Sequence, residues 1–185
     1  KALSEVPNLS IQTTELAMAQ AKKEGGLDVL RDLTLPLRGA VVRQFLEVKS
    51  VSDEELRSAL RAADTVFNFI TSSLPSQELV GFAASAMETL KSAMAKSTLL
   101  TKSEIEPSRI LDQLTLLAVV SIFIEKAIAN TIISLSTFAS WEIARSNQDK
   151  LGVLVQEALR LESPTQITSR VAVEEIFLRE QKIKK

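Results

Sequence analysis

The residues with the clearest chemical potential are two neighbouring opposite charges, Glu125 and Lys126. They directly follow the most apolar stretch of the chain, residues 114–124. A carboxylate and an ammonium group beside an apolar helix could act as a general acid–base couple, or could be held by solvent and by other charges. The second arrangement is the commoner one. We therefore expect Glu125 and Lys126 to be solvated or paired, and we keep them as candidate polar groups of a site.

Cysteine and histidine are both absent from the sequence. Without them there is no disulfide, no thiolate nucleophile and no imidazole base or ligand. Zinc sites, iron–sulfur clusters and Ser-His-Asp catalysis are thereby excluded. We expect no metal site, and the remaining catalytic groups are carboxylates, lysine, arginine and hydroxyls.

The size and charge of the chain indicate one globular domain spanning residues 1–185. Apolar residues make up 45% of the sequence, a share typical of a protein with a packed core. The formal net charge of −1 gives no basic surface for nucleic acid, so we expect no nucleic-acid partner. A membrane span needs about 20 apolar residues, and Glu125 and Lys126 interrupt the apolar run too early. No signal-like segment opens the sequence. We expect a cytoplasmic protein without a membrane span.

Helical signals dominate the elements that must position these residues. Ser52 and Glu55 form the pattern of a capping box ahead of a run of apolar residues at helical spacing. Pro107 suits the first turn of a long helix that reaches about residue 144, and the first half of that helix is apolar on nearly every side. We expect it to be the buried central element. Further helical runs are predicted over residues 9–23, 37–48, 53–70, 76–94 and 151–159.

The C-terminal residues 164–185 predict a small β appendage. Val171 and Val173 alternate with polar residues, and Ile176–Leu178 and residues 182–184 flank a turn-like segment at residues 179–181. The fold class is therefore mainly α, a helical bundle around a long central helix with a C-terminal β-hairpin. On the second helical run, the residues predicted to share one face are Leu37, Val41, Phe45 and Val48.

Two segments resemble bacterial cytochromes P-450. Residues 151–172, LGVLVQEALRLESPTQITSRVA, match the region of that family that carries a Glu-x-x-Arg pair before a Ser-Pro and a strand. Residues 26–46, GLDVLRDLTLPLRGAVVRQFL, match an earlier region in the right order. The resemblance implies a P-450-like helical bundle in which Glu157 and Arg160 join a buried ion network. A bare Glu-x-x-Arg is equally typical of an exposed pair on a helix surface.

The departures from the family concern its haem chemistry. In the family, the central helix carries an Ala/Gly-Gly-x-acid-Thr motif that binds and protonates dioxygen. Here Ile124 replaces the glycine, Lys126 the acid and Ala127 the threonine. If the haem space is emptied, Val120, Phe123, Ile124 and Ala127 are the candidate lining of an apolar pocket.

The ligand of the haem iron is missing as well, because the family uses a cysteine thiolate. Arg170 stands where the family often has an arginine that contacts a haem propionate. We interpret Arg170 as a residue left from that role, or as one that now pairs with a carboxylate. We expect no cofactor and no monooxygenase activity.

Three functions remain open at this point. The first is a haem-free, non-catalytic helper or binding module for a partner enzyme, as haem-free relatives in antibiotic pathways support a sugar transferase. The apolar helix stripes and an isolated hairpin favour a partner protein or a homo-oligomer. The second is a repurposed enzyme that binds an apolar small molecule for cofactor-free cyclisation or isomerisation. The third is an inactive fragment of a monooxygenase.

Overall fold

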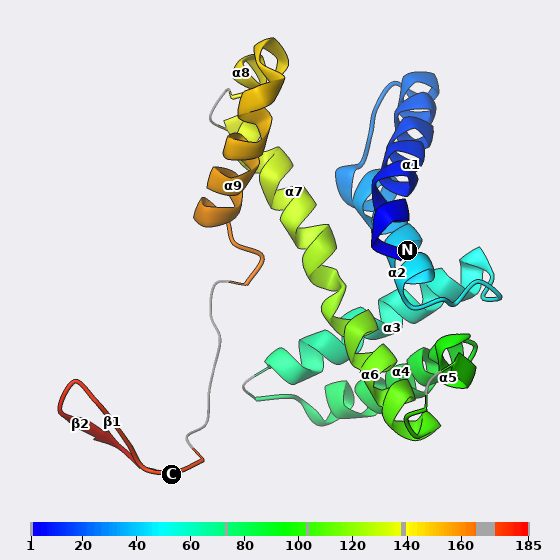
Figure 1. Cartoon of the computed structure of the whole chain (residues 1–185), viewed down its shortest axis with the longest axis vertical. Helices are drawn as coiled ribbons and strands as arrows, with labels where there is room; N and C mark the ends of the chain where they lie inside the picture. The colour runs from blue at the N-terminus through cyan, green and yellow to red at the C-terminus, as the bar shows by residue number, and fades with distance from the viewer. Residues whose placement is uncertain (1, 73, 103, 138–139, 166–172, 185) are drawn as a thin grey trace.

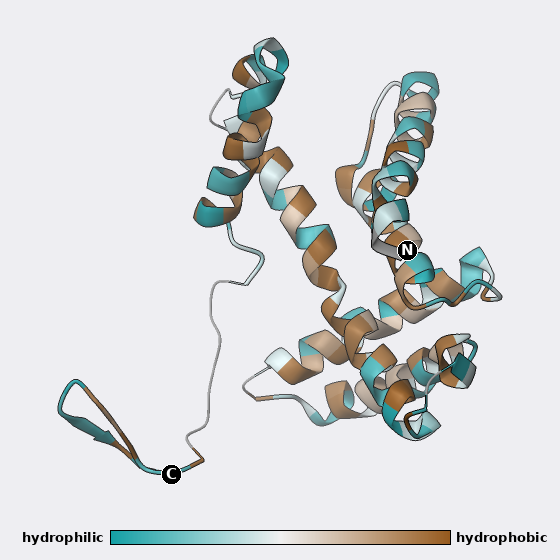
Figure 2. Cartoon of the chain, viewed as in Figure 1, coloured by the Kyte–Doolittle hydropathy of each residue, from teal (hydrophilic) through white to brown (hydrophobic). Residues whose placement is uncertain are grey.

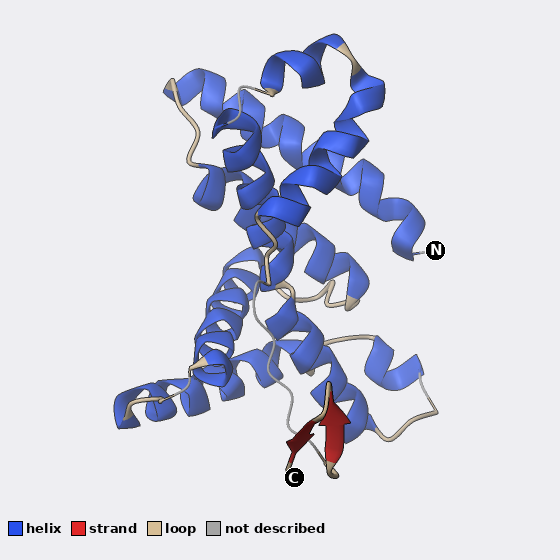
Figure 3. Cartoon of the chain, turned by 90° about the vertical axis from the view of Figure 1, so that its left-hand side faces the viewer, coloured by secondary structure: helices blue, strands red, loops and turns tan. Residues whose placement is uncertain are grey.

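The computed structural model describes residues 2–72, 74–102, 104–137, 140–165 and 173–184. Figures 1 and 3 show a mainly helical molecule with a small two-stranded antiparallel sheet, as the sequence predicts. The helical elements are α1 (Ala2–Glu24), η1 (Val29–Thr34), α2 (Leu35–Phe45), α3 (Asp53–Thr71), α4 (Gln77–Met94), α5 (Leu99–Lys102), α6 (Pro107–Val120), α7 (Ile122–Thr137), α8 (Trp141–Ser146), η2 (Gln148–Lys150) and α9 (Leu151–Leu161). The strands are β1 (Ile176–Leu178) and β2 (Gln181–Ile183).

Local signals set several helix ends where the sequence predicts them. The capping box of α3 is complete: the Ser52 hydroxyl accepts from the Glu55 amide, and the Glu55 carboxylate accepts from the Ser52 amide. Pro107 occupies the first turn of α6, where its missing N–H leaves no bond unmade. Gly25 follows α1 with φ of 76°, a left-handed conformation that glycine adopts without strain.

The main hydrophobic core lies where α3, α4 and α6 pack together, and we call these three helices the bundle (Figure 1). The larger side chains at its centre include Leu60 and Val66 of α3 and Leu90 and Met94 of α4, all of them almost fully buried. Ala118 of α6 is also fully buried, and its small side chain lets α6 approach α3 closely. A short segment after α2 adds Val48 and Val51 to the same core.

The central helix is a rod of two segments, α6 and α7, joined at Ser121 (Figure 1). The prediction that it is buried on all sides is wrong. Leu116 and Leu117 of α6 and Ile133 of α7 are exposed, and Figure 2 shows hydrophobic residues along much of the rod. The reason is geometric, because α3, α4 and α5 cover only one side of α6, while η1, α2 and α9 cover parts of α7.

By length and composition, Pro107–Thr137 is the one helical stretch in the described part of the chain that could cross a membrane. Only 22% of its most apolar window is buried within the structure. This is weak evidence on its own, because the core helix of a soluble protein passes the same test. The exposed apolar surface nevertheless has to be explained.

The buried face of α2 is displaced by one position from the predicted one. Leu37 is buried, but Val42 is buried in place of Val41, and Phe45 at the end of the helix is 41% exposed. Val48 is buried, but it lies beyond the end of α2. The cause is that Arg38 shares the buried face with Leu37 and Val42, so that counting apolar residues alone selects the wrong stripe. The segment between α4 and Pro107 contains the short helix α5.

The C-terminal elements form two parts. Helix α9 packs against α7, and α8 connects them through η2 (Figure 1). The hairpin pairs Ile176 with Ile183 and Leu178 with Gln181 in an antiparallel register. Arg179 and Glu180 make its two-residue turn with positive φ angles of 47° and 67°, so β2 begins one residue earlier than predicted. Val171, predicted to belong to the β appendage, lies outside the described residues.

Candidate functional site

A buried arginine lies where α2 crosses α3 and the junction of α6 with α7. The Arg38 side chain has an exposed fraction of 0%. Its Nη1 atom is 2.6 Å from Asp64 Oδ1 of α3 and 3.3 Å from Glu125 Oε2 of α7. Its Nε atom donates to the Ser121 hydroxyl at 2.9 Å. We call Arg38, Asp64, Ser121 and Glu125 the Arg38 cluster.

Ser121 links this cluster to the break in the central helix. Its hydroxyl accepts from Arg38 and donates to the Ala118 carbonyl oxygen at 2.6 Å. Ser121 is the residue between α6 and α7, and it is buried. The guanidinium therefore fastens α2 to the point at which the rod changes segment. A break in a helix exposes polar backbone groups, and side-chain hydrogen bonds at such a point stabilise the altered geometry.

The charges of the cluster are unequal. One guanidinium faces two carboxylates, whose side chains are 34% exposed at Asp64 and 20% exposed at Glu125. Burial of an arginine costs several kcal/mol unless its donors are paired, and here both Nη1 and Nε are paired. Arg38 Nη2 is buried and has no hydrogen-bond partner in the described part of the chain. The cluster is thus tightly held but not fully satisfied.

Glu125 and Lys126 are not paired with each other. Glu125 reaches Arg38, whereas Lys126 Nζ lies 4.8 Å above the centre of the Phe67 ring. Phe123 meets the same ring edge-on, with centroids 5.4 Å apart and planes at 90°. Cation–π and edge-to-face contacts of this kind are each worth about 0.5–1.5 kcal/mol. Glu125 therefore links α7 to α2, and Lys126 links α7 to α3.

The four residues predicted to line an apolar pocket lie close to this cluster on the central helix. Val120, Phe123, Ile124 and Ala127 are all half-buried. The structure brings Phe123 together with Phe67, so that this aromatic side chain fills space between helices. The pocket that the four residues would line stays a prediction.

The Glu-x-x-Arg pair is on the surface. Arg160 Nε is 2.8 Å from Glu157 Oε2, and Nη2 is 2.6 Å from Oε1, a two-bond contact between residues one helical turn apart. Both side chains are more than half exposed. The Arg160 hydrogen bonds lower the pKa of the Glu157 carboxyl. In this chain the pair has the geometry of an exposed i,i+3 pair, and Arg170 lies outside the described residues.

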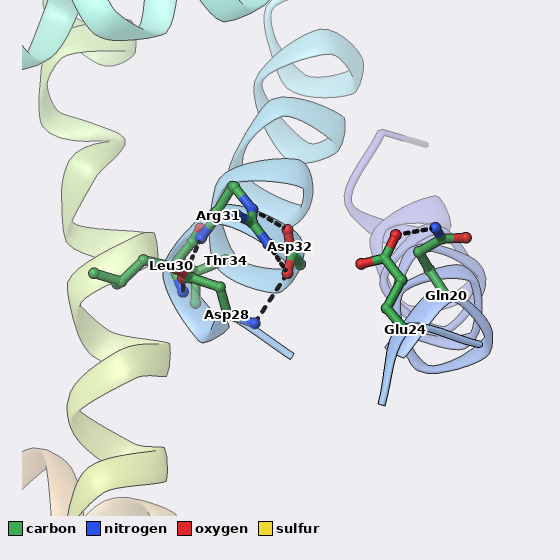
Figure 4. Close-up of polar contacts among 7 residues, drawn as sticks. All are labelled: Gln20, Glu24, Asp28, Leu30, Arg31, Asp32 and Thr34. Carbon is green, nitrogen blue, oxygen red and sulfur yellow. Dashed lines mark hydrogen bonds and ion pairs between the residues drawn. The ribbon is translucent and has the colours of Figure 1, made fainter. Parts of the chain in front are cut away.

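A second polar arrangement occupies the π-helix η1, shown in Figure 4. Asp28 Oδ1 caps it by accepting from the amides of Leu30 and Arg31, both at 3.0 Å. Arg31 and Asp32 form a two-bond ion pair at 2.6 and 2.9 Å, which lowers the pKa of Asp32 and raises that of Arg31. Short π-helices occur often at functional sites, because their altered register moves side chains that a regular helix would place elsewhere.

Sequence reasoning found Glu125 but missed Arg38 and Asp64. The two residues are 26 positions apart in the sequence, and Glu125 is 87 positions from Arg38, so no local spacing connects them. One signal was present: Thr34, Arg38 and Val42 are four residues apart and share a face, which places a charge on an apolar stripe.

The Arg38 cluster is a set of ion pairs and hydrogen bonds between helices. Each carboxylate of the cluster faces the same guanidinium, and no group of three or more acidic side chains in the described segments could hold a metal ion. The cluster ties α2, α3 and α7 together at the break in the rod. No protein-family model, no curated protein and no solved structure matches this chain.

Proposed function

We propose that this chain is a haem-free, cytochrome P-450-like protein that acts as a non-catalytic helper, a binding module for a partner enzyme. The resemblance of residues 26–46 and 151–172 supports the relationship, and the replacement of the oxygen-activating motif by Ile124, Lys126 and Ala127 supports the loss of catalysis. The observation that carries the binding role is the exposed apolar surface of the central helix.

That surface begins on the side of α6 that α3, α4 and α5 leave uncovered. Leu116 is 58% exposed and Leu117 49% exposed, although the segment around them is the most apolar of the chain. Ile133 continues the exposure along α7, and the exposed residues of α8 and α9 include Trp141, Ile143 and Val153. Each Å² of such surface removed from water contributes about 25 cal/mol to binding before the costs of association are subtracted. A partner that covers these side chains would therefore gain hydrophobic energy.

A protein suits this surface better than a lipid bilayer. Glu125 and the Arg38 cluster lie near the middle of the Pro107–Thr137 rod, where a bilayer is least tolerant of charge. Helices α2 and α3 also pack against the rod at that level, and the described part of α3 carries several charged residues. A partner protein can cover Leu116 and Leu117 and leave those charges in place.

The test is native mass spectrometry of the protein purified together with its partner at natural expression levels. We expect one complex of defined stoichiometry with a second, different chain. Leu116→Glu with Leu117→Glu should dissociate the complex, and Ser92→Glu on an exposed position of α4 should not. A monomer, a homodimer alone or partition into phospholipid vesicles would each contradict the proposal.

The haem-free part of the proposal has its own test, the visible spectrum of the purified protein. We expect no Soret band, and no change on adding carbon monoxide to the reduced sample. A Soret band that shifts with carbon monoxide would overturn the proposed loss of haem.

A further inference from the structure

We propose that a groove between α1, η1, α2 and α3 binds a small organic anion, a phosphate or carboxylate carried on an apolar body. The groove has a volume of about 660 Å³, within the range of small-molecule sites. None of its lining residues belongs to α6–α9, so this inference stands independently of the proposed partner. Its lining includes the apolar residues Leu35, Pro36 and Ala40 and the basic residues Arg57 and Arg61.

Between α2 and α3 the groove is lined by apolar residues, and some of them have small side chains. Leu56 and Leu60 of α3 are buried beside Gly39 of α2. A Cβ atom at Gly39 would lie 3.6 Å from Leu60 Cδ1 and 3.8 Å from Leu56 Cδ2, so the glycine is not forced by a clash. Gly39 and Ala40 have little or no side chain, so they leave space in this part of the groove. Because Leu56 and Leu60 are only 4% and 1% exposed, an apolar body in the groove would mainly contact Leu35, Pro36 and Ala40, which are half-buried or exposed.

The groove carries excess positive charge. Four arginines line it against two aspartates, and two of the arginines already have partners: Arg31 pairs with Asp32, and Arg43 pairs with Asp53 at 2.6 Å. No ion pair or hydrogen bond from the side chain of Arg57 or Arg61 is present among the residues that the structure describes. These two guanidinium groups are therefore available to an oxyanion.

Arg57 and Arg61 also have a suitable spacing. They are four positions apart on α3, which places them on the same helix face one turn apart. Two guanidinium groups at that separation can donate to the same phosphate or carboxylate, and charge-assisted hydrogen bonds of this type are about twice as strong as neutral ones. The formal charge of the whole chain is −1, so the positive charge here is a local feature.

The small number of unpaired arginines in the groove favours a small molecule over a macromolecule as the ligand. Two unpaired arginines neutralise one oxyanion, whereas nucleic acid binding draws on an extended set of phosphate contacts. The remaining cations of the groove, Arg31 and Arg43, are engaged by their aspartates. The apolar lining would then add to the affinity for an anion with an apolar body, but not to the affinity for inorganic phosphate, which has none.

The test is an isothermal titration of the full chain with 1-naphthyl phosphate, with neutral 1-naphthol and inorganic phosphate as matched probes. We expect saturable binding of 1-naphthyl phosphate at least about 10-fold tighter than that of either other probe. Arg57→Gln with Arg61→Gln should weaken it by about 10-fold or more. Arg109→Gln, an exposed arginine of α6 outside the groove, should leave it unchanged.

Ala40→Trp provides a second variant that fills the groove without changing its charge. We expect it to abolish binding while the far-ultraviolet circular dichroism stays that of the unchanged chain. No saturable binding of 1-naphthyl phosphate, equal affinity for the Arg57→Gln/Arg61→Gln protein, or equal affinity for inorganic phosphate would each overturn the inference.

Discussion

The bundle and the C-terminal arm, which we define as the second half of α7 together with α8 and α9, use apolar residues in different ways. In the bundle, Leu60, Leu90 and Met94 are buried to the last few per cent. In the arm, Val153 is 66% exposed and Trp141 41% exposed, and Ala158 is a small residue among those that are buried. Helix composition alone does not separate the two regions, because what differs is the number of neighbouring helices.

This difference identifies which region stabilises the fold and which region has apolar surface that a partner could cover. The core of the bundle already gains hydrophobic energy from its buried side chains, whereas the exposed apolar side chains of the arm, like Leu116 and Leu117 of α6, would gain it only on binding a partner. The Arg38 cluster lies between the two regions, at the junction of α6 and α7, and anchors the base of the arm to α2 and α3. Substitutions in the bundle should therefore lower the free energy of unfolding much more than substitutions in the arm.

The largest effect is expected in the bundle. Leu90→Ala removes a side chain that is 0% exposed, and it should lower the free energy of unfolding by about 3 kcal/mol or more. Leu151→Ala in α9 is the matched control, because that leucine is already 41% exposed and should cost less than about 1 kcal/mol. Urea denaturation measures both. Equal losses would remove the distinction between bundle and arm.

The second effect concerns the junction. Arg38→Met should lower the free energy of unfolding by about 2–3 kcal/mol. This is less than the loss of about 3–5 kcal/mol typical of breaking a fully buried pair, because Asp64 and Glu125 keep some contact with water. The double variant Arg38→Met/Glu125→Gln should recover part of this loss, since it removes a carboxylate left without its partner. The same denaturation experiment applies. Strict additivity of the two single substitutions would show that the residues are not coupled.

The Arg38 cluster also marks the limit of prediction from sequence. The capping box at Ser52 and Glu55 is local, so three residues of spacing suffice to predict it. The ion pair of Arg38 with Glu125 depends on how α2 and α7 cross, which no periodicity encodes. Likewise, the apolar character of α6 predicts a buried helix, but the exposure of Leu116 depends on which neighbours the fold supplies. Local chemistry is predictable here, and tertiary partners are not.

A third comparison uses helix caps. Ser52→Ala removes the side-chain cap of α3 and should lower the free energy of unfolding by about 1 kcal/mol. Helix α9 of the arm begins after Lys150 without a side-chain cap hydrogen bond, so Lys150→Ala should cost far less. Thermal unfolding of the two variants tests this. A larger loss from Lys150→Ala would contradict the view that the bundle is the more precisely specified region.

A fourth, smaller effect should appear on the exposed surface of the arm. Val153→Ser changes a side chain that is mostly in water, so the free energy of unfolding of the isolated chain should shift by less than about 0.5 kcal/mol. Binding of an apolar dye such as anilinonaphthalene sulfonate should fall, because the variant removes part of the exposed apolar surface. A destabilisation comparable to that of Leu90→Ala would mean that Val153 is buried within the chain itself.

The smallest effect is the pH dependence of the Glu157–Arg160 pair. Because Arg160 lowers the pKa of the Glu157 carboxyl in the folded chain, the pair contributes stability above the unfolded pKa of that carboxyl. This contribution is lost as the pH falls through the lowered folded pKa. An NMR titration of the Glu157 side chain should return its pKa to the ordinary glutamate range in Arg160→Gln, and 1 M salt should move it the same way. A pair covered within the chain, as the resemblance to cytochromes P-450 implies, would resist salt because buried charges are poorly screened. Sensitivity to salt would therefore place α9 with the exposed arm, and resistance would place it with the buried bundle.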